Sequence, residues 1–367
     1  MADTKLYLRP IGFLYGAAAQ EAMADGLALP LAEGPIAFTA AELIEGAPGN
    51  SKARLFTARS LAESHDADLS KVLERVTAAR PPFAGRSLDR PLLMGIVNVT
   101  PDSFSDGGLY DTKEEAIVHA ADLVNAGAAI IDIGGESTRP GSDAVEEDEE
   151  LGRIVPVLDG LSGLDAVISV DTRKAKVARA AAKAGAAILN DVSAFTYDPQ
   201  SLAAAAEMGL SVILMHAQGE PKTMHLNPVY ADVVLEVFDY LEQRIEAAEA
   251  AGISRAKIAA DPGVGFGKTM EHTLSLLANL SLFHGLGVPL LVGASRKRFI
   301  AGIAGGYQPK SREPGSLAVA IAAASQGIQI LRVHDVAATR QALAVWWAAT
   351  FSAEIKANSH PGQPQIV

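Results

Sequence analysis

From about residue 88 onward, short runs of aliphatic and β-branched residues alternate with longer stretches rich in Ala, Leu and Glu. This alternation is typical of an α/β fold with a parallel sheet, in which each strand is followed by a covering helix. The pattern predicts eight strands, at Leu92–Val97, Ala129–Ile133, Ala166–Val170, Ala186–Leu189, Ser211–Met215, Lys257–Ala260, Pro289–Val292 and Gln329–Val333. Eight strand–helix units over residues 88–352 predict a (β/α)8 TIM barrel, and an open doubly wound sheet is the alternative.

Each predicted strand ends on, or is soon followed by, a polar residue. In chain order these residues are Asn98, Glu136, Asp171, Asn190, His216, Asp261, Ser295 and His334, with Arg332 inside the last strand. Polar residues also mark where strands simply stop, but eight in succession make that interpretation insufficient. Because the carboxyl ends of barrel strands converge at one mouth, the pattern predicts a functional site there.

The first 85 residues do not continue the strand–helix pattern. We interpret residues 1–85 as a small appended N-terminal module of unknown role, with a candidate helix at Ser60–Arg75. The segment Pro81–Gly85 contains two prolines and a glycine and predicts a linker. Residues 358–367 have the composition of a flexible tail.

Composition narrows the class of protein. Of the 367 residues, 49% are hydrophobic and 20% charged, which is typical of a soluble globular protein. The net charge of -12 argues against a nucleic-acid partner. The absence of Cys excludes disulfides, thiolate catalysis and Cys-based zinc sites. We find no apolar leader and no run of about 18 apolar residues, so we expect a cytoplasmic protein without a membrane partner.

Two predicted loops combine glycine and proline with reactive side chains. The first, Asn98–Gly108, carries an amide, hydroxyls and two carboxylates, and the second, Gly134–Ser142, contains Arg139. Glycine and proline permit a close-fitting loop, and Arg139 is placed where it could swing over an anion. Taken alone, a segment of this kind is more often an ordinary surface loop than a site.

The segment Asp261–Thr269 resembles a phosphate-binding loop but fails that pattern. The G-x-x-x-x-G-K-[ST] motif requires glycine at position 262, where this chain has proline. What remains is an acidic strand end followed by a glycine-lined floor with Phe266. Such a surface suits a flat ring, because the carboxylate accepts paired N–H groups while the aromatic side chain packs against the ring.

Basic residues gather after the seventh and eighth predicted strands. Arg296, Lys297 and Arg298 are adjacent at an expected helix N-terminus, and Arg332 and His334 belong to the next strand end. These loops commonly bind phosphate in barrels. In a chain of net negative charge, the cluster predicts an anion pocket rather than a solvated surface.

Two conspicuous runs are better explained by structure than by chemistry. Glu146–Glu150 is expected to form the acidic first turn of a helix rather than a metal site. Trp346–Trp347, in an Ala-rich helix, is expected to serve packing.

Several motifs, in order, carry a resemblance over about residues 90–350. They are MGIVNVTPDSFSDGG, IDIGGESTRPGS, SVDTRKAKVA, AAILNDVSA, ILMHAQG, DPGVGFGKT, GASRKRF and RVHD. With these motifs the chain resembles the dihydropteroate synthase family of folate biosynthesis. The resemblance implies a barrel that joins 6-hydroxymethyl-7,8-dihydropterin pyrophosphate to p-aminobenzoate and releases pyrophosphate. It also implies Mg²⁺, a homodimer and inhibition by sulfonamides.

The resemblance also implies roles for individual residues. By this resemblance, Lys297 contacts the carbonyl side of the pterin and Arg332 stacks on its face. Arg298 stands where some members of the family carry Ser, so the resemblance does not fix the detail of the pocket for the p-aminobenzoate carboxylate. The implied catalytic residues are Asp106, Arg139 and Lys297, and Asn98 is the implied metal ligand. The implied substrate-binding residues are Thr138, Pro140, Asp171, Asn190, Met215, Asp261, Gly265, Phe266, Lys297, Arg298, Arg332 and His334.

Two alternatives share the pterin-binding strand ends. A methyltetrahydrofolate-type methyltransferase would need neither the first two loops nor the Lys297, Arg332 and His334 cluster, all of which are present. An inactive pterin-binding paralogue would be favoured by loss of Asp261 or Lys297, and neither is lost.

Overall fold

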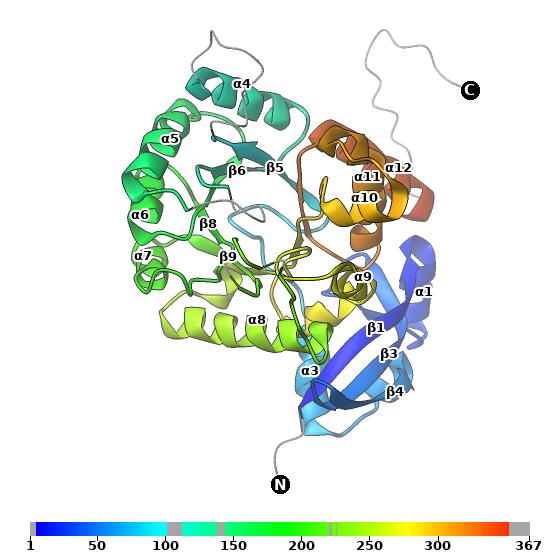
Figure 1. Ribbon diagram of the computed structural model, residues 1–367. Helices are drawn as coiled ribbons and strands as arrows, with labels where there is room; N and C mark the ends of the chain where they lie inside the picture. The colour runs from blue at the N-terminus through cyan, green and yellow to red at the C-terminus, as the bar shows by residue number, and fades with distance from the viewer. Residues whose placement is uncertain (1–4, 101–111, 138–143, 220–221, 225, 352–367) are drawn as a thin grey trace, which may run out of the picture.

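A computed structural model describes residues 5–100, 112–137, 144–219, 222–224 and 226–351 of the chain. It consists of a parallel barrel ringed by helices and an antiparallel sheet module that packs against one side of it (Figure 1). The predicted tail at residues 358–367 lies outside the described residues.

Eight parallel strands form the barrel, as predicted. Their order is β10-β9-β8-β7-β6-β5-β12-β11, and a parallel bridge between Ala260 and Leu290 joins the two outer strands. This closure rules out the open doubly wound sheet. The strands are β5 Leu92–Asn98, β6 Ile130–Gly134, β7 Val167–Asp171, β8 Ile188–Asp191, β9 Ser211–Met215, β10 Ile258–Asp261, β11 Leu291–Val292 and β12 Ile330–Val333.

Helices connect successive strands and cover the outside of the barrel (Figure 1). They are α4 Thr112–Asn125, α5 Glu147–Gly160, α6 Ala175–Lys183, α7 Ser201–Glu207, α8 Val233–Ala250, α9 Met270–Ala278, α10 Arg298–Ala304, α11 Glu313–Ala324 and α12 Val336–Phe351. Shorter 3-10 turns occur at η2 Arg255–Lys257, η3 Leu280–Leu286 and η4 Pro309–Arg312. Among the described residues, none of the helices combines the length and apolarity needed to cross a membrane.

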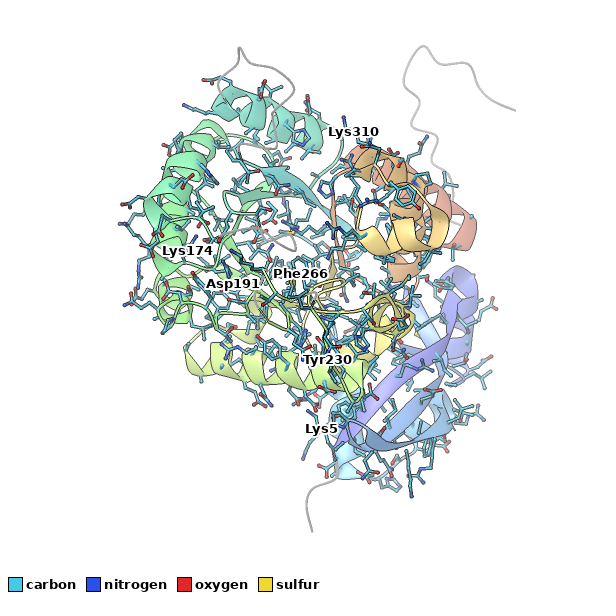
Figure 2. All side chains as sticks on the ribbon, in the orientation of Figure 1. Lys5, Lys174, Asp191, Tyr230, Phe266 and Lys310 are labelled. Atoms are coloured by element: carbon cyan, nitrogen blue, oxygen red, sulfur yellow. The ribbon has the colours of Figure 1, made fainter. Side chains whose placement is uncertain are left out.

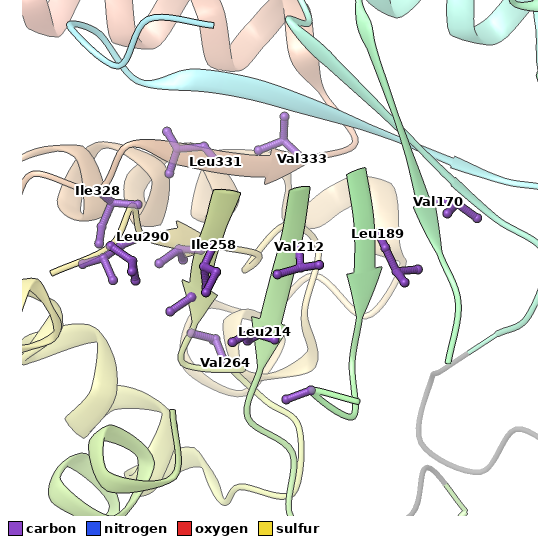
Figure 3. Close-up of a cluster of buried hydrophobic side chains, with 14 of the residues drawn as sticks. Val170, Leu189, Val212, Leu214, Ile258, Val264, Leu290, Ile328, Leu331 and Val333 are labelled. Atoms are coloured by element: carbon purple, nitrogen blue, oxygen red, sulfur yellow. The ribbon is translucent and has the colours of Figure 1, made fainter. Parts of the chain in front are cut away.

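Alternate strand residues face two different cores. Val212 and Leu214 belong to the large core between strands and helices, part of which Figure 3 shows, whereas Ile213 belongs to the core inside the barrel. This alternation follows from the two-residue period of a strand. The inner core is apolar near the amino ends of the strands, where Ile130 and Ile188 are fully buried.

The N-terminal module is mainly a sheet, which the sequence pattern did not reveal. Its elements are β1 Leu6–Tyr15, α1 Gly16–Ala24, β2 Leu29–Pro30, β3 Ile36–Ala47, β4 Asn50–Thr57, α2 Ala58–Ala62 and α3 Ala67–Thr77. The single helix expected at Ser60–Arg75 is wrong, because two helices share this range. Asp66 separates them: its carboxylate accepts hydrogen bonds from the backbone N–H groups of Asp68 and Leu69 and starts α3.

The module docks on helix α8 through one buried tyrosine and several ion pairs. Tyr7 is fully buried, its ring packs edge-on against Phe238, and its hydroxyl donates to Asp239 at 2.9 Å. Lys5, labelled in Figure 2, pairs with Asp239 and with Glu242, in each case at 2.6 Å. The contact therefore combines apolar burial with a charge network of half-buried side chains.

The segment Pro81–Gly85 does more than link the two parts. Phe83 is fully buried and belongs to the core inside the barrel, with Met94 and Ile213. A two-residue bridge, in which Phe83 and Arg86 exchange backbone hydrogen bonds of 3.0 and 2.9 Å, holds it in place. The predicted linker thus closes the amino end of the barrel with an aromatic side chain.

Candidate active site

Strand register places several of the predicted residues next to one another at the mouth. Asn98 pairs with Gly134, Gly134 with Asp171, and Asp171 with Asn190, across strands β5 to β8. On the next two strands, Met215 pairs with Asp261. The carboxyl ends of β5 to β8 therefore hold one row in register, and Met215 and Asp261 form a second pair that lies two residues further along β9 than Ile213, the partner of Asn190.

Asp132, on β6, is central to this mouth and was not among the predicted residues. It is fully buried, and its carboxylate accepts hydrogen bonds from Ser169 at 2.7 Å and Asn190 at 3.1 Å. A charged residue within the apolar run Ile130–Ile133 was the available signal, since a buried carboxylate requires partners. Asp132 lies two residues beyond Ile130, which faces the barrel interior, and so follows the same inward period.

Arg332, on β12, links two carboxylates. Its Nε donates to Asp132 at 2.6 Å and an Nη donates to Asp171 at 2.8 Å. Neighbouring anions therefore match the charge of Arg332, which reduces what this residue adds to the predicted cationic cluster. The guanidinium is instead fixed in one orientation, with two of its N–H groups committed.

Asp171 is an unusual carboxylate. Burial raises its pKa to about 7, against the opposing effect of Arg332, and Asp132 raises it further. One of its oxygens, Oδ1, is buried and has no hydrogen-bond partner among the described residues. A buried polar atom without a partner is costly, so this oxygen is suited to a donor or cation from a ligand.

The neighbouring oxygens also bear on metal binding. Asn98 Oδ1 and Asp171 Oδ2 lie on either side of Gly134, 3.8 and 3.9 Å from the point where a Cβ would stand. These are the hard oxygen ligands that Mg²⁺ prefers, although Mg²⁺ often keeps waters and needs few protein ligands. Within the described residues, no group of three or more His, Asp or Glu side chains is arranged to hold a metal by itself.

Asp261 and Lys297 face each other across the mouth. Asp261 is buried, burial raises its pKa, and its Oδ1 accepts the backbone N–H of Gly263 at 2.7 Å. Desolvation lowers the pKa of Lys297 to about 7, and Arg332 lowers it further. The Lys297 ammonium lies over the Phe266 ring, 4.3 Å from its centroid, and donates to the carbonyl of Val264.

The glycines after Asp261 allow two loops to pack backbone against backbone. At Gly263, φ is +68° and a Cβ would lie 1.8 Å from the carbonyl oxygen of His216. At Gly267, φ is +61° and a Cβ would lie 2.3 Å from the carbonyl oxygen of Gln218. Only glycine fits these positions, which set Phe266 between them at the centre of the mouth (Figure 2).

A buried lysine fastens the same loop from beneath. Lys268 Nζ lies 2.9 Å from His216 Nδ1 and donates to the carbonyl of Phe266 at 3.0 Å. Burial lowers the pKa of both side chains, that of His216 to about 2, so His216 stays neutral and accepts from Lys268. Tyr230 adds a further tie, since its hydroxyl donates to the carbonyl of Gly267 at 2.8 Å.

The remaining basic residues of the cluster have separate positions. Arg296 has a φ of 58° and pairs with Asp335, so it belongs to the helix-side structure rather than to an anion pocket. Arg298 is exposed at the first position of α10. Its positive charge is unfavourable there, because the N-terminus is the positive end of the helix dipole. His334 lies against Ser295, with 3.1 Å between its Nδ1 and the hydroxyl.

The second loop is anchored by a buried ion network that the sequence analysis did not foresee. Glu136, at the start of the loop, accepts from Arg173 at 2.9 Å and from Lys174 at 3.2 Å. Lys174 also pairs with Glu150, which is fully buried. The acidic run does begin helix α5 as expected, but its last residue has this additional structural role.

Asp191 provides another such anchor, next to Asn190. Its carboxylate accepts from the backbone N–H groups of Ser193 at 2.7 Å and Phe195 at 3.1 Å. Burial raises its pKa to about 6. It shapes the turn after β8 and leaves Asn190 to face the mouth. Four predicted residues, Asp106, Thr138, Arg139 and Pro140, lie outside the described residues.

A closed (β/α)8 barrel whose mouth buries carboxylates, an amide, a lysine and an arginine has the architecture of a barrel enzyme with its site at the carboxyl ends of the strands. The family described as pterin binding enzyme matches residues 94–334, and the chain belongs to this family. Within the family it groups with the dihydropteroate synthases, which are transferases of folate biosynthesis.

The similarity to these relatives is extensive. The dihydropteroate synthase of Escherichia coli K12 is 50% identical over 273 residues, covering 74% of this chain and 96% of the relative. That of Bacillus subtilis is 43% identical over 249 residues, covering 68% and 85%. A Xanthomonas albilineans dihydropteroate synthase solved with 4-aminobenzoic acid has a TM-score of 0.70 and 49% identity, covering 74% of this chain and 97% of that one. These relatives do not favour the methyltransferase alternative.

Proposed function

We propose that this mouth condenses 6-hydroxymethyl-7,8-dihydropterin pyrophosphate with p-aminobenzoate to give 7,8-dihydropteroate and pyrophosphate. The observation that carries the proposal is the inward layer of Asp132, Asp171, Asn190 and Asp261, with Arg332 held between two of its carboxylates. Relatives from Xanthomonas albilineans have been solved with 4-aminobenzoic acid and with 7,8-dihydropteroate, at 49% and 46% identity.

The pterin would lie on this inward layer. Its aminopyrimidinone edge presents paired N–H groups, which suit the carboxylate of Asp261 and the free oxygen of Asp171. Asn190 offers a further polar contact and Met215 an apolar one. Lys297 would donate to the ring carbonyl, and the planar guanidinium of Arg332 would stack on the ring face.

The pyrophosphate would lie toward the first strand. Asn98, with the neighbouring Asp171, offers the oxygen ligands expected for Mg²⁺, and His334 stands on the adjacent strand end. When bound, Mg²⁺ would neutralise charge on the departing pyrophosphate oxygens. We expect the activity to require Mg²⁺.

The chemical step proposed is a dissociative substitution. The C–O bond to pyrophosphate breaks with its electron pair leaving on oxygen, and the amine nitrogen of p-aminobenzoate then forms the new C–N bond and loses a proton. An aniline is already neutral near pH 7, so preorganised charge rather than a strong base supplies the main stabilisation. Asp106 and Arg139, on the first two loops, would order around the cationic pterin-methyl intermediate and exclude water.

The p-aminobenzoate would lie further out. Phe266 and Gly265 form the floor beside Lys297, and Thr138 and Pro140 would complete the pocket from the second loop. Arg298 is exposed at the N-terminus of α10, where its charge does not stabilise the helix. It is the proposed partner of the p-aminobenzoate carboxylate.

A homodimer is the proposed assembly. Adjoining helices α9 and α10 expose Met270, Leu274 and Ile303 by 40%, 42% and 59%, and Tyr307 beyond them is 89% exposed. An apolar patch of this kind is typical of a protein interface. Sedimentation should give twice the chain mass, and Ile303→Asp should shift the protein toward monomer. The cytoplasmic location expected from composition stays a prediction.

The activity is tested by a coupled assay of pyrophosphate release. Release should require the pterin pyrophosphate and p-aminobenzoate together, and the product should be 7,8-dihydropteroate. Asp261→Asn changes a carboxylate in the mouth, and Asp165→Asn makes the same change at the surface, where 93% of the side chain is accessible. Comparing the two variants separates an effect at the mouth from a general effect of removing one negative charge. Release that proceeds without p-aminobenzoate, or equal activity in both variants, would contradict the proposal.

A further inference from the structure

A second cavity lies at the opposite end of the barrel from the mouth, between the N-terminal module and the barrel. It has a volume of about 280 Å³. The module contributes the loop 31–36 and the barrel contributes the segments before β5 and β12 together with α12. Of these, the module loop, the segment before β5 and the α12 residues lie outside residues 94–334, the part matched by the family. The cavity therefore lies away from the reaction site, and the extension completes it against the barrel.

One wall of the cavity is apolar and aromatic. Leu31, Ile36 and Ile328 are almost completely buried along it. Trp346 and Trp347 lie side by side on α12, with ring centroids 6.0 Å apart in an edge-to-face arrangement. The Phe351 ring stacks on Trp347 with the centroids 4.1 Å apart, so the indoles contribute mainly ring edges to an apolar wall that suits an aromatic ligand.

The cavity also contains a positive charge without an anionic partner. Arg80 donates to the backbone carbonyls of Ala78, Arg75 and His284, at 2.6, 2.7 and 2.9 Å. Within the described part of the chain no carboxylate pairs with it, and its buried Nε has no hydrogen-bond partner. Desolvation lowers the pKa of Arg80 to about 10, as expected for a cation in an apolar setting with no anion beside it.

A second arginine is placed over the aromatic wall. The Arg90 guanidinium lies 4.9 Å from the centre of the Trp347 ring, within the range of a cation–π contact. The carboxylates of Glu33 and Asp89 also belong to the lining but are exposed. The deeper part of the cavity therefore presents cations, carbonyls and rings, and an anion would meet its acidic residues only at the rim.

The loop that closes the cavity is held in a costly conformation. Ala32 and Glu33 are consecutive non-glycine residues with φ of 53° and 48°. The backbone N–H of Ala32 donates to the carbonyl of Val76 at 2.9 Å, which fixes the loop to the end of α3. Strained backbone of this kind tends to occur where a ligand is bound.

We propose that this cavity binds a small planar aromatic carboxylate. The carboxylate would lie between Arg80 and Arg90, and the ring would lie against the apolar wall of Leu31, Ile36 and Ile328 and the edges of the two indoles. Arg80, whose terminal nitrogens already donate to carbonyls, would attract the carboxylate through its uncompensated charge, and the Arg90 guanidinium would supply the fork that suits a carboxylate. The volume admits a ligand of about one or two rings. Because the ligand would touch both the module and the barrel, it would fasten one to the other and stabilise the folded chain.

Ligand binding in this cavity can be followed by tryptophan fluorescence. Trp346 and Trp347 are its two tryptophans, so intrinsic tryptophan fluorescence reports on this cavity alone. Benzoate is the probe, titrated into the full chain at the red edge of indole excitation, where benzoate does not absorb. Benzamide keeps the ring without the charge, and cyclohexanecarboxylate keeps the charge without the flat ring. We expect a saturable fluorescence change with benzoate and at least about tenfold weaker binding of both analogues.

Variants locate the binding. Arg80→Gln and Arg90→Gln should each weaken benzoate binding by about tenfold, and Arg80→Lys should weaken it less. Arg86→Gln is the matched control, because Arg86 lies in the same segment but does not line the cavity. Benzoate should also raise the melting temperature of the parent protein and of Arg86→Gln, and not that of Arg80→Gln. The Asp261→Asn protein should bind benzoate normally, so a failure at the mouth does not count against the cavity. No saturable change, equal binding of the three probes, or an equal loss in Arg86→Gln would overturn the proposal.

Discussion

The two ends of the barrel differ in the side chains that face its interior, although consecutive inward-facing positions on a strand are only two residues apart. On β6, Ile130 faces the amino end and Asp132 the mouth, and on β10 the corresponding pair is Ala259 and Asp261. At the amino end, Phe83 packs with Ile130 and Ala259 in an apolar layer. At the mouth, the inward positions carry carboxylates, and burial raises the pKa of Asp171 and of Asp261.

The difference shows how one barrel separates stability from chemistry. Buried carboxylates in the mouth cost folding free energy unless a partner compensates them, and Asp171 and Asp261 both have raised pKa values because burial is incompletely compensated. The apolar layer two residues earlier offsets this cost by removing aliphatic surface from water. A substitution at the amino end should therefore change the free energy of unfolding, and a substitution at the mouth should change the affinity for the ligand.

The largest effect is expected at the amino end. Phe83→Ala leaves a cavity beneath the inner core and should lower the free energy of unfolding by about 3–5 kcal/mol. Phe83→Leu retains most of the volume and should cost clearly less. Denaturant unfolding followed by circular dichroism measures both. If the two variants lose less than about 1 kcal/mol, Phe83 does not plug the barrel.

A somewhat smaller effect is expected at the mouth. Asp261→Asn replaces an acceptor by a donor that faces the donors of the pterin, and it removes the counter-charge near Lys297. Affinity for the pterin pyrophosphate should fall by roughly 2–4 kcal/mol. Calorimetric titration measures this loss, with Asp165→Asn as the surface control. Unchanged affinity would show that Asp261 is not the anchor.

The docking contact of the module should contribute less. Tyr7→Phe removes one hydroxyl that donates to Asp239 but retains the ring against Phe238. We expect a loss of about 0.5–1.5 kcal/mol in unfolding free energy, with no change in affinity at the mouth. Tyr197→Phe, at a 47% exposed position outside the proposed dimer patch, provides the control. A weaker pterin affinity in Tyr7→Phe would mean that the two ends are coupled.

The smallest effect is one that both ends share. Burial lowers the pKa of His216 at the mouth to about 2 and that of His284 at the amino end to about 3, from an ordinary value of 6.5. As the pH falls through 6.5, the unfolded chain takes up protons that the folded chain does not. Stability should therefore fall, by about 1 kcal/mol for each histidine between about pH 6.5 and 5.5. His216→Asn and His284→Asn should each flatten this dependence, and a slope equal to that of the parent would contradict it.

Much of the barrel could be predicted, because its strands are buried on both sides and stand out as apolar runs. The strand ends Asp171, Asn190 and Asp261 could be named for the same reason, since a polar residue after such a run is easily recognised. Asp132 could not, because it lies inside a run and its role depends on Arg332, 200 positions away. Only the closed barrel brings the two together.

The module was less accessible to sequence reasoning. Its strands β3 and β4 form a sheet with one solvent-facing side, and β4 is almost entirely exposed, so no continuous apolar run marks it. Phe83 is a single aromatic residue in a proline-rich segment, and its burial depends on the barrel beneath it. Arg296, which seemed part of an anion pocket, is committed to Asp335 by a left-handed backbone turn.

The separation of the two ends is tested most directly by the turnover number of the Phe83→Ala protein. It should be measured by pyrophosphate release at a temperature where circular dichroism shows the variant to be folded, beside the Asp261→Asn protein. We expect Phe83→Ala to keep its turnover number and Michaelis constants within about threefold of the parent while its unfolding free energy falls. We expect Asp261→Asn to keep its unfolding free energy within about 1 kcal/mol while its pterin affinity is lost. A folded Phe83→Ala protein whose turnover number falls more than about tenfold would contradict this account.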